Sequence, residues 1–315
     1  MKILVTGASG FVGRSFIRRF SSRADVQLHG VARSRLNLPN YTSADLSLPF
    51  DLPFKPDAVI HGAARASPWG TPAQFEQQNV DATKEVIRFC ERNGCPKLVY
   101  LSSSSVFYRH EHQFGITEDS PIGPSFVNEY ARTKYLAEEL VHRYQGSWVI
   151  LRPRAVFGPG DTVLFPRILA AAAKGRLPLF VNEGTPAVGD LIYIESLCDY
   201  LLTAATRPDI RGCFNVTNNQ PVPIQDFLLI TLDRLGLPIP SRQVKLSTAM
   251  LTATLTEAVW RLLHLPGEPP ITRFGVSVFA YSKTFDVTRA ITAMGPPSVD
   301  LIDGVERFVR WQRSQ

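Results

Sequence analysis

At 315 residues, the chain slightly exceeds the usual size of one hydrophobic core, so two lobes are expected. A hydrophobic content of 44% and a charged content of 20% describe a soluble globular protein, and the apolar runs are too short to span a membrane. The net charge of +6 is spread along the sequence, which favours an arginine-rich solvated surface over nucleic-acid binding.

The first half of the chain alternates short apolar runs with helical patterns. Strands are predicted at 2–7, 26–33, 57–64, 97–104 and 148–158, with a further short strand before residue 45. Helices are predicted at 11–22, 72–94 and 128–140. Continuous apolar strands that alternate with helices indicate a parallel sheet covered on both faces. The expected fold class is therefore α/β, with a Rossmann-type doubly wound parallel sheet.

The pattern changes after about residue 160. A helix and a short strand are predicted within 163–181, a return to the sheet at 189–206 and 212–218, and helices at 224–236 and 249–265 between proline-rich joints. We therefore expect a dinucleotide-binding domain over 1–160, with returning segments near 188–217. A smaller, mostly helical C-terminal substrate lobe would comprise 161–187 and 218–315, with a ligand cleft between the two lobes.

A phosphate-binding loop is predicted where the first strand meets the first helix. The stretch VTGASGFVG places Gly7, Gly10 and Gly13 at three-residue spacing, followed at the helix start by Phe11 and Val12. Glycines permit a tight turn and a close approach of the backbone to a pyrophosphate, and a helix start offers free N–H groups. The alternative is a merely structural glycine turn, which the strand–loop–helix context disfavours.

The end of the second strand indicates which dinucleotide is bound. An acid usually stands there in NAD sites, to bind the ribose 2′-hydroxyl, but this chain has Arg33 followed by Ser34 and Arg35. A guanidinium suits a 2′-phosphate, so NADP(H) is favoured and NAD(H) is possible. The alternative is an ordinary exposed loop arginine. Asp45 and Leu46, after the next short strand, are expected to flank the adenine.

The helix at 128–140 carries Tyr130 and Lys134 one turn apart, so both side chains lie on one face. The simpler interpretation is a surface contact in which the lysine stem rests on the ring. The alternative is a catalytic pair, in which the ammonium lowers the tyrosine pKa from about 10 toward neutrality. The pair alone is weak evidence, so the remaining motifs must decide between these interpretations.

No metal site or disulfide is expected. The four cysteines, at 90, 95, 198 and 213, lack metal-type spacing, and His110 and His112 have no evident third ligand. The N-terminal residues lack the long apolar segment of a signal peptide, so a cytoplasmic, reduced protein is predicted. Segment 249–265 is expected to pack in the core of the second lobe, with contact to an apolar substrate or a membrane surface as the alternative.

Several motifs together resemble the extended short-chain dehydrogenase/reductases. They are TGASGFVG, HGAA at 61–64, NVDAT at 79–83, LSSSSVF at 101–107, YARTK and LRPRAVFGPGD, in the order and spacing of that family. The segments SPWG at 67–70, FPRIL at 165–169, GDLIYI at 189–194 and 269–290 resemble its 3β-hydroxysteroid dehydrogenase-like branch. That branch interconverts ketones and secondary alcohols on apolar skeletons, including sterols and long-chain β-keto acids.

The resemblance implies a set of site residues. Tyr130 and Lys134 match the family's catalytic pair, and Ser103 matches its catalytic serine. Further positions match the cofactor site: Ala63, Ala64, Asn79, Ser102, Pro153 and Val156. Three positions depart from the broader pattern, one of them being MGP at 294–296 in place of the usual LGY. Gly189 stands where many sugar-nucleotide epimerases have an arginine, so one contact to a diphosphate is missing, and Tyr108 replaces a glycine near the substrate entrance.

The expected function is hydride transfer between NAD(P) and an apolar ketone or secondary alcohol, with Ser103, Tyr130 and Lys134 as the catalytic residues. The alternative within the same superfamily is a nucleotide-sugar epimerase or dehydratase. A third interpretation, a non-catalytic dinucleotide sensor, is disfavoured because a sensor needs no tuned tyrosine. The expected partner is a small-molecule substrate, and the resemblance makes a homodimer possible.

Overall fold

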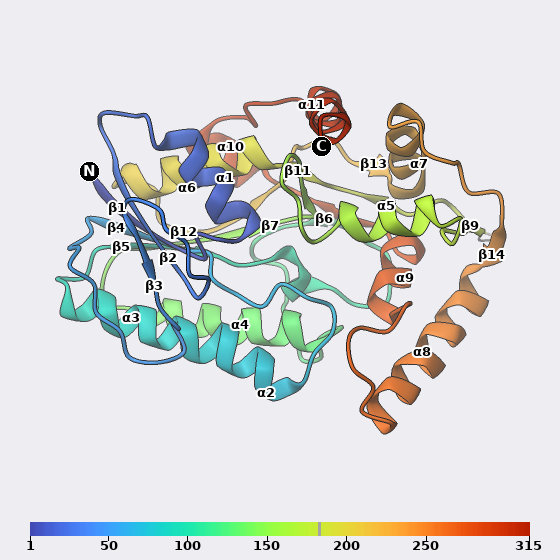
Figure 1. The fold of residues 1–315 in the computed structure, drawn as a ribbon, viewed down its shortest axis with the longest axis horizontal. Coiled ribbons are helices and arrows are strands. Elements are labelled where there is room, and N and C mark those ends of the chain that lie inside the picture. The colour runs from blue at the N-terminus through green and yellow to red at the C-terminus, as the bar shows by residue number, and fades with distance from the viewer. Residues whose placement is uncertain (182–183) are drawn as a thin grey trace.

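The computed structural model describes residues 1–181 and 184–315. A seven-stranded parallel sheet runs through its centre, in the order β12-β7-β5-β4-β1-β2-β3 (Figure 1). Its strands are β1 (Lys2–Thr6), β2 (Gln27–Ala32), β3 (Tyr41–Ser43), β4 (Ala58–His61), β5 (Lys97–Leu101), β7 (Trp148–Pro153) and β12 (Gly212–Val216). The order changes direction between β1 and β4, as in a doubly wound fold. The predicted fold class is confirmed.

The apolar runs of the central strands reflect burial on both faces of the sheet. In β5, Leu98, Val99 and Tyr100 are all buried. Val99 belongs to one hydrophobic core, while Leu98 and Tyr100 belong to the core on the opposite face. Because successive side chains of a strand point to opposite faces, a strand covered on both sides has no polar position to alternate with.

Helices cover the two faces of the sheet (Figure 1). One layer contains α2 (Pro72–Phe75), the π-helix η1 (Glu76–Asp81), α3 (Ala82–Arg92) and α4 (Glu129–His142). The other contains α1 (Phe11–Phe20), α6 (Ile194–Thr206), α10 (Thr288–Met294) and α11 (Leu301–Arg313). The single helix predicted at 72–94 is thus one helical run that is interrupted by a π-helical segment.

Two sequence predictions about strands were wrong in part. Segment 189–206 does not return to the main sheet, because most of it forms α6 on the face of that sheet. Its buried residues Leu197, Leu201 and Ala205 recur every four positions, which is the spacing of a helix face. The strand predicted at 148–158 is broken, because Ala155 has a φ of 42° between β7 and β8 (Val156–Phe157).

The remaining elements lie beyond the carboxyl ends of the large sheet (Figure 1). The helices are α5 (Phe165–Ala173), α7 (Ile224–Arg234), α8 (Leu246–Leu262) and α9 (Arg273–Ala280). A small sheet joins β13 (Val222–Pro223), β10 (Val188–Gly189), β15 (Lys283–Phe285) and β6 (Gln113–Ile116). Two pairs complete the set, β11 (Ile192–Tyr193) with β8 and β14 (Gln243–Lys245) with β9 (Leu179–Val181). The boundaries between the two lobes stay a prediction.

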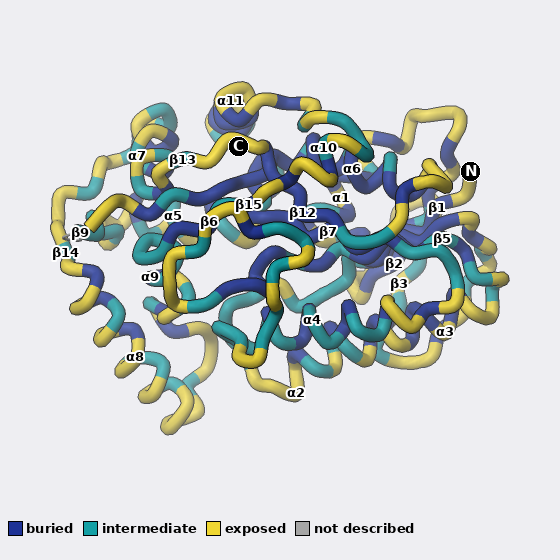
Figure 2. Tube along the Cα trace, turned by 180° about the vertical axis from the view of Figure 1, so that it is seen from behind, coloured by how far each residue is buried: buried dark blue, intermediate teal, exposed yellow. Residues whose placement is uncertain are grey.

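Helix α8 extends away from the body of the molecule, and much of its length is exposed (Figure 2). Leu246, Ala249 and Ala253 are its only buried residues and form a small cluster with Val276 of α9. Four further apolar residues of the helix are between 43% and 78% exposed: Leu251, Leu255, Val259 and Leu262. Core packing therefore accounts for one face of the predicted segment. Among the described residues, no helix is long and apolar enough to cross a membrane.

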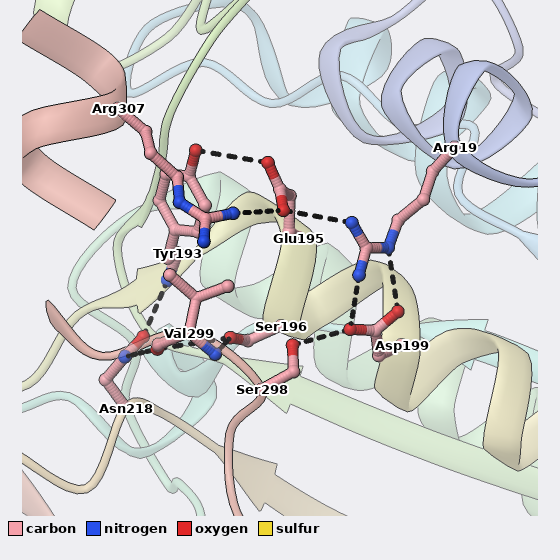
Figure 3. Close-up of polar contacts among 9 residues, drawn as sticks. All are labelled: Arg19, Tyr193, Glu195, Ser196, Asp199, Asn218, Ser298, Val299 and Arg307. Carbon is pink, nitrogen blue, oxygen red and sulfur yellow. Dashed lines mark hydrogen bonds and ion pairs between the residues drawn. The ribbon is translucent and has the colours of Figure 1, made fainter. Parts of the chain in front are cut away.

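Polar contacts join α1, α6 and the C-terminal segment (Figure 3). Arg19 of α1 donates two hydrogen bonds to Asp199 of α6, at 2.8 and 2.9 Å, and one to Glu195 at 2.9 Å. Glu195 also accepts from Arg307 of α11 at 2.9 Å. These four side chains are all partly exposed, so each ion pair is expected to contribute little to stability.

A buried amide below this ion-pair network fixes the backbone instead (Figure 3). The Oδ1 of Asn218 accepts from the Tyr193 N–H at 2.8 Å, and its Nδ2 donates to the Val299 carbonyl at 2.7 Å. Asn218 therefore joins β11 to the chain that enters α11. Its removal would leave a buried donor and a buried acceptor without partners.

We expect Asn218→Ala to lower the free energy of unfolding by about 2–4 kcal/mol, because two buried backbone groups lose their hydrogen bonds. The matched control, Asp199→Asn, is expected to cost less than about 1 kcal/mol, because its ion pairs are solvated. Urea unfolding followed by circular dichroism measures both values. Equal losses in the two variants would contradict the distinction between buried and exposed contacts.

Candidate active site

The predicted site residues gather along one edge of the large sheet. Because β1, β2, β4, β5 and β7 are parallel, their carboxyl ends share that edge. The loops that follow them contain the glycine loop at 7–10, Arg33, Ala63 and Ala64, Ser103 and Arg154. Pro153 ends β7 and Val156 begins β8, so these two predicted cofactor-site residues also lie at this edge. Such an edge is where ligands bind in open α/β sheets.

The glycine loop forms a cradle that larger residues would fill. Gly7 has a φ of +72°, and a Cβ there would lie 2.8 Å from the Ala63 backbone nitrogen. A Cβ on Gly13 would lie 2.4 Å from the Gly7 carbonyl oxygen. Helix α1 begins directly after Gly10 with Phe11, which is buried, and the half-buried Val12. Because Gly10 has no side chain to cap the helix, the first N–H groups of α1 suit an anionic group such as a pyrophosphate.

Side chains from the second strand approach this cradle. Ser34 donates to the Ser9 hydroxyl at 3.2 Å, and Arg14 donates to the Ser9 carbonyl at 3.1 Å. Arg33 is exposed and donates to Gln78 at 3.1 Å. Hydrogen bonds from Ser47 and the charge of Arg33 together hold the pKa of Asp45 below its usual range.

Leu46 is buried in the core beneath α3 rather than open to the cleft. Of the two residues predicted to flank the adenine, Asp45 is therefore the one that lies near Arg33, and Leu46 supports the loop from below.

A buried chain of hydrogen bonds joins the cradle to α4. The Thr83 hydroxyl donates to the Asn79 carbonyl at 2.6 Å, so it accepts from Nε2 of His61 at 3.0 Å. Nδ1 of His61 then accepts from Thr6 at 2.7 Å. Burial, together with the charge of Lys134, lowers the pKa of His61 to about 3, so the ring is neutral. Both ring nitrogens of His61 are used within this buried chain of hydrogen bonds.

Asn79 connects three parts of the site from the π-helix η1. Its Oδ1 accepts from the Arg65 N–H at 2.7 Å, and its Nδ2 donates to Thr133 of α4 at 2.9 Å. Thr133 stands directly before Lys134. The π-helix therefore fixes the loop after β4 relative to the helix that carries Tyr130 and Lys134, and π-helical turns occur often at functional sites.

Ser103 and Tyr130 lie together at the mouth of the site. Ser103 precedes the short helix η2 (Ser104–Phe107), and its Oγ lies 2.9 Å from the hydroxyl of Ser105. Asn128 caps α4 by accepting from the Ala131 N–H at 2.8 Å, which places Tyr130 in the first turn. Burial raises the pKa of Tyr130 to about 12, and a hydrogen bond with Ser103 acts in the opposite direction.

Lys134 is buried beneath this pair. Its Nζ donates to the Leu101 carbonyl at 2.6 Å and lies 4.2 Å from the centre of the Tyr100 ring. Burial lowers the pKa of Lys134 to about 7, while the charge of Glu138 raises it. The predicted fall of the Tyr130 pKa toward neutrality is therefore wrong for this structure. Desolvation dominates both groups, and the ammonium is directed at the carbonyl and the ring.

Ser102 faces away from the cleft. Its hydroxyl donates to Glu138, which also receives hydrogen bonds from the Arg152 guanidinium, at 2.6 Å from Nη2 and 3.0 Å from Nε. All three residues are buried. The predicted cofactor contact of Ser102 stays a prediction, and in this arrangement its hydroxyl belongs to an ion-pair network that joins α4 to β7.

The absence of an arginine at position 189 does not leave that place without a cation. A Cβ on Gly189 would lie 3.4 Å from Nη2 of Arg154, and 2.9 Å from Cδ1 of Ile224. The guanidinium thus arrives from β7 instead of from residue 189. Sequence spacing does not reveal that this guanidinium lies beside Gly189, and the missing contact to a diphosphate stays a prediction.

Comparison with known proteins now adds to this geometry. Residues 3–217 match the family described as NAD dependent epimerase/dehydratase family. The chain belongs to that family. Its likeness to the 3β-hydroxysteroid dehydrogenase-like branch of the extended short-chain dehydrogenase/reductases, inferred from the motifs, is confirmed by the relatives that follow.

Two curated relatives span almost the whole chain. The 2-alkyl-3-oxoalkanoate reductase of Stenotrophomonas maltophilia (strain K279a) is 33% identical over 98% of this chain and 98% of its own length. The decarboxylating sterol-4-alpha-carboxylate 3-dehydrogenase of Schizosaccharomyces pombe is 27% identical over 99% and 98%. Among solved structures, MoeE5 in complex with UDP-glucose and NAD superimposes with a TM-score of 0.76 at 20% identity, covering 100% of this chain and 99% of that one. At that identity the likeness concerns the fold.

Several residues that contact the predicted site residues could not be identified from the sequence. Tyr100, Glu138 and Arg152 surround Lys134 and Ser102, yet they lie within apolar or helical patterns that predict only core or surface positions. A buried charge in a strand, such as Arg152 in LRPR, was the one available signal. Thr133 was equally hidden, because its role depends on a hydrogen bond to Asn79, 54 positions away.

The buried ammonium of Lys134 should make stability depend on pH. Its folded pKa of about 7 lies below the unfolded value of about 10.4, so the unfolded chain binds more protons between these limits. The free energy of unfolding should therefore rise from pH 7 to pH 9.5. Urea titrations of the wild type and Lys134→Met measure this slope.

The slope should be smaller in Lys134→Met. Burial also lowers the pKa of Lys97 and of Lys283, each to about 8, and both residues remain in the variant. The difference between the two proteins therefore isolates Lys134. Identical slopes would show that Lys134 keeps its ordinary pKa in the folded protein.

Proposed function

We propose that this chain is an NAD(P)-dependent oxidoreductase that interconverts a ketone and a secondary alcohol on an apolar, steroid-like or long-chain substrate. The observation that carries the proposal is that Ser103 and Tyr130 lie within hydrogen-bonding reach of each other, with Lys134 buried one turn further along the same helix. The relatives named above as a reductase and a dehydrogenase support the same reaction type.

The residues at the sheet edge fit a dinucleotide. Gly7, Gly10 and the N–H groups at the start of α1 would hold the pyrophosphate, and Lys134 would hold ribose hydroxyls. A bound nicotinamide dinucleotide would supply or accept the hydride. Ala63, Pro153 and Val156 would line the cofactor cleft.

Ser103, Tyr130 and Lys134 would carry out the proton transfer that accompanies hydride transfer. Ser103 would donate a hydrogen bond to the substrate carbonyl oxygen and keep it near Tyr130. Because burial holds the Tyr130 pKa at about 12, the phenol stays protonated at neutral pH and can donate its proton as negative charge develops. In the oxidation direction the same atom would act as the base, which requires the charge of Lys134 to assist.

The preference for NADP(H) rests on the end of β2. No acid stands at 33–35, and the Ser34–Ser9 contact holds this loop against the glycine cradle. Arg33 would pair with a 2′-phosphate there. Asp45, whose pKa the charge of Arg33 lowers, would compete for the same guanidinium.

A nucleotide-sugar epimerase or dehydratase is the second candidate. The position of Arg154 beside Gly189 favours it, since a cation there could meet a diphosphate. A screen of the pure protein with ketone, secondary-alcohol and nucleotide-sugar panels tests both functions. Only an oxidoreductase consumes or forms one NAD(P)H for each product molecule, which absorbance measures. Conversion of a nucleotide sugar without any ketone reduction would support the second candidate.

Tyr130→Phe should lower turnover by roughly 10²- to 10⁴-fold, because the variant loses the transferable proton but little volume. Cofactor affinity should stay nearly unchanged. Steady-state kinetics and a fluorescence titration of the reduced cofactor measure the two quantities. Lys134→Ala is the comparison, and it should damage both. Near wild-type turnover in Tyr130→Phe would rule out this mechanism.

The wild type should bind NADPH roughly 10- to 100-fold more tightly than NADH, the gain expected for a charge-assisted contact to phosphate. Arg33→Ala should remove most of this preference, whereas Arg35→Ala, which keeps Arg33, should not. Fluorescence titration with both reduced cofactors measures it. Tighter binding of NADH by the wild type would overturn the preference.

A further inference from the structure

Two buried arginines at the end of β7 have opposite surroundings. Arg152 lies in β7, and Arg154 follows the last residue of that strand, Pro153. The guanidinium of Arg152 lies 4.9 Å from the centre of the Phe107 ring, and that of Arg154 lies 5.2 Å from the Tyr108 ring. Arg152 is neutralised by Glu138 at 2.6 Å. Among residues 1–181 and 184–315, no ion pair within 4.0 Å includes Arg154.

The Arg154 side chain is buried without a full set of partners. The residue is 6% exposed, and its Nε has no hydrogen-bond partner among the described residues. The nearby carboxylate of Asp190 accepts from the Phe285 N–H at 2.9 Å and from Thr217 at 3.3 Å. Asp190 is therefore held by the small sheet and does not close on the guanidinium.

A second buried cation stands on the same ring. Lys283 is 5% exposed, its Nζ lies 5.8 Å from the centre of the Tyr108 ring, and it donates to the Glu111 carbonyl. Asp190 stands near Arg154 and Glu111 near Lys283, so the cations of this cluster do not outnumber its carboxylates. The Arg154 guanidinium is nevertheless buried without an ion pair or a partner for Nε among the described residues. A buried charge is costly unless a counter-charge compensates it, so this unpaired guanidinium points to an anion.

The cluster adjoins the proposed catalytic residues. Tyr108 follows η2 directly, and its hydroxyl lies 3.0 Å from the hydroxyl of Ser104, the neighbour of Ser103. The ring that Arg154 faces is thus hydrogen-bonded to the residue next to Ser103, and Gly189, which has no side chain, leaves space beside Nη2 of the guanidinium.

We propose that Arg154 is the anion-binding residue of the substrate site and that it binds a carboxylate carried by the ketone or alcohol substrate. The planar guanidinium matches the two oxygens of a carboxylate. One unpaired guanidinium matches a monovalent acid better than a diphosphate, which Asp190 would repel. This inference rests on the proposed function, because it names the polar end of an otherwise apolar substrate.

Kinetics with a matched substrate pair tests the inference. A long-chain 3-hydroxy acid and its methyl ester are oxidised with NADP⁺ and with NAD⁺, and the reduced cofactor is followed by absorbance. The wild type should prefer the acid. Arg154→Met should lower kcat/KM for the acid by roughly 10- to 100-fold, the effect of one lost charge-assisted contact, and leave the ester within about twofold.

Three variants separate charge, shape and fold. Arg154→Lys keeps the positive charge but loses the planar pair of N–H donors, so it should keep part of the preference for the acid that Arg154→Met loses. Arg109→Met removes an arginine from the loop that follows Tyr108, where its side chain is exposed, and it should behave as the wild type. Arg154→Met should melt no earlier than the wild type, because it removes an uncompensated buried charge. The proposal would be overturned if Arg154→Met melted at a lower temperature than the wild type and Arg154→Lys kept the wild-type ratio of kcat/KM for the acid to that for the ester. Arg154 would then stabilise the fold and not bind substrate.

Direct binding supplies a readout without turnover. Isothermal titration of the cofactor-loaded protein uses dodecanoate, its methyl ester and UDP. Dodecanoate binding that is weakened in Arg154→Met but not in Arg109→Met supports the proposal. UDP binding that depends on Arg154, without binding of dodecanoate, overturns the carboxylate assignment. If the wild type oxidises neither substrate, the proposed function fails, while the dodecanoate titration still decides whether Arg154 binds a carboxylate.

Discussion

The site depends on two opposite charges buried one turn apart on the inner face of α4. Lys134 binds the Leu101 carbonyl at the end of β5, and Glu138 binds Ser102 and Arg152 on β5 and β7. Together they attach the helix to the carboxyl edge of two adjacent strands. Because both charges are desolvated, sliding or rotating α4 would expose each to an apolar surface without its partner. The position of Tyr130 follows from this attachment.

The polar groups under the cleft form a nearly closed set of donors and acceptors. Thr6, His61, Thr83 and Asn79 pass hydrogen bonds from β1 to η1, and Asn79 continues to Thr133 on α4. A neutral histidine in the middle of this chain uses both ring nitrogens, one as acceptor and one as donor. Buried hydrogen bonds therefore hold β1, η1 and α4 together under the site.

Much of the architecture could be predicted from the sequence because its signals are local. Gly7, Gly10 and Gly13 mark the loop by their spacing between a strand and a helix, and apolar runs mark the strands. Segment 189–206 was predicted to return to the sheet because a short buried helix and a buried strand are both rich in isoleucine and leucine. The pKa of Tyr130 was misjudged because its value depends on burial and on where Lys134 points. The role of Arg154 was hidden for the same reason: LRPR shows two arginines, and only the fold shows that one has a carboxylate partner.

Predictions that concern location and assembly, a cytoplasmic protein and a homodimer, depend on surfaces and surroundings that lie beyond a single folded chain. The exposure of the apolar residues of α8 could not be predicted either. A helix that mixes threonine and leucine has the same sequence pattern whether its neighbours cover one side of it or all sides.

The π-helix η1 also limits how this chain can change in length. Its wider turn accommodates an additional residue between α2 and α3, and Asn79 lies in it. Deleting one residue there would return the turn to an ordinary α-helix, so α2 and α3 would keep nearly the same rotation about their axes. Val86 and Phe89 would stay packed on the sheet, but the wide turn that presents Asn79 to Arg65 and Thr133 would be lost. A single-codon deletion at 76–81 is thus expected to spare the fold and damage the site, whereas the same deletion inside α3 would turn the rest of that helix by about 100°.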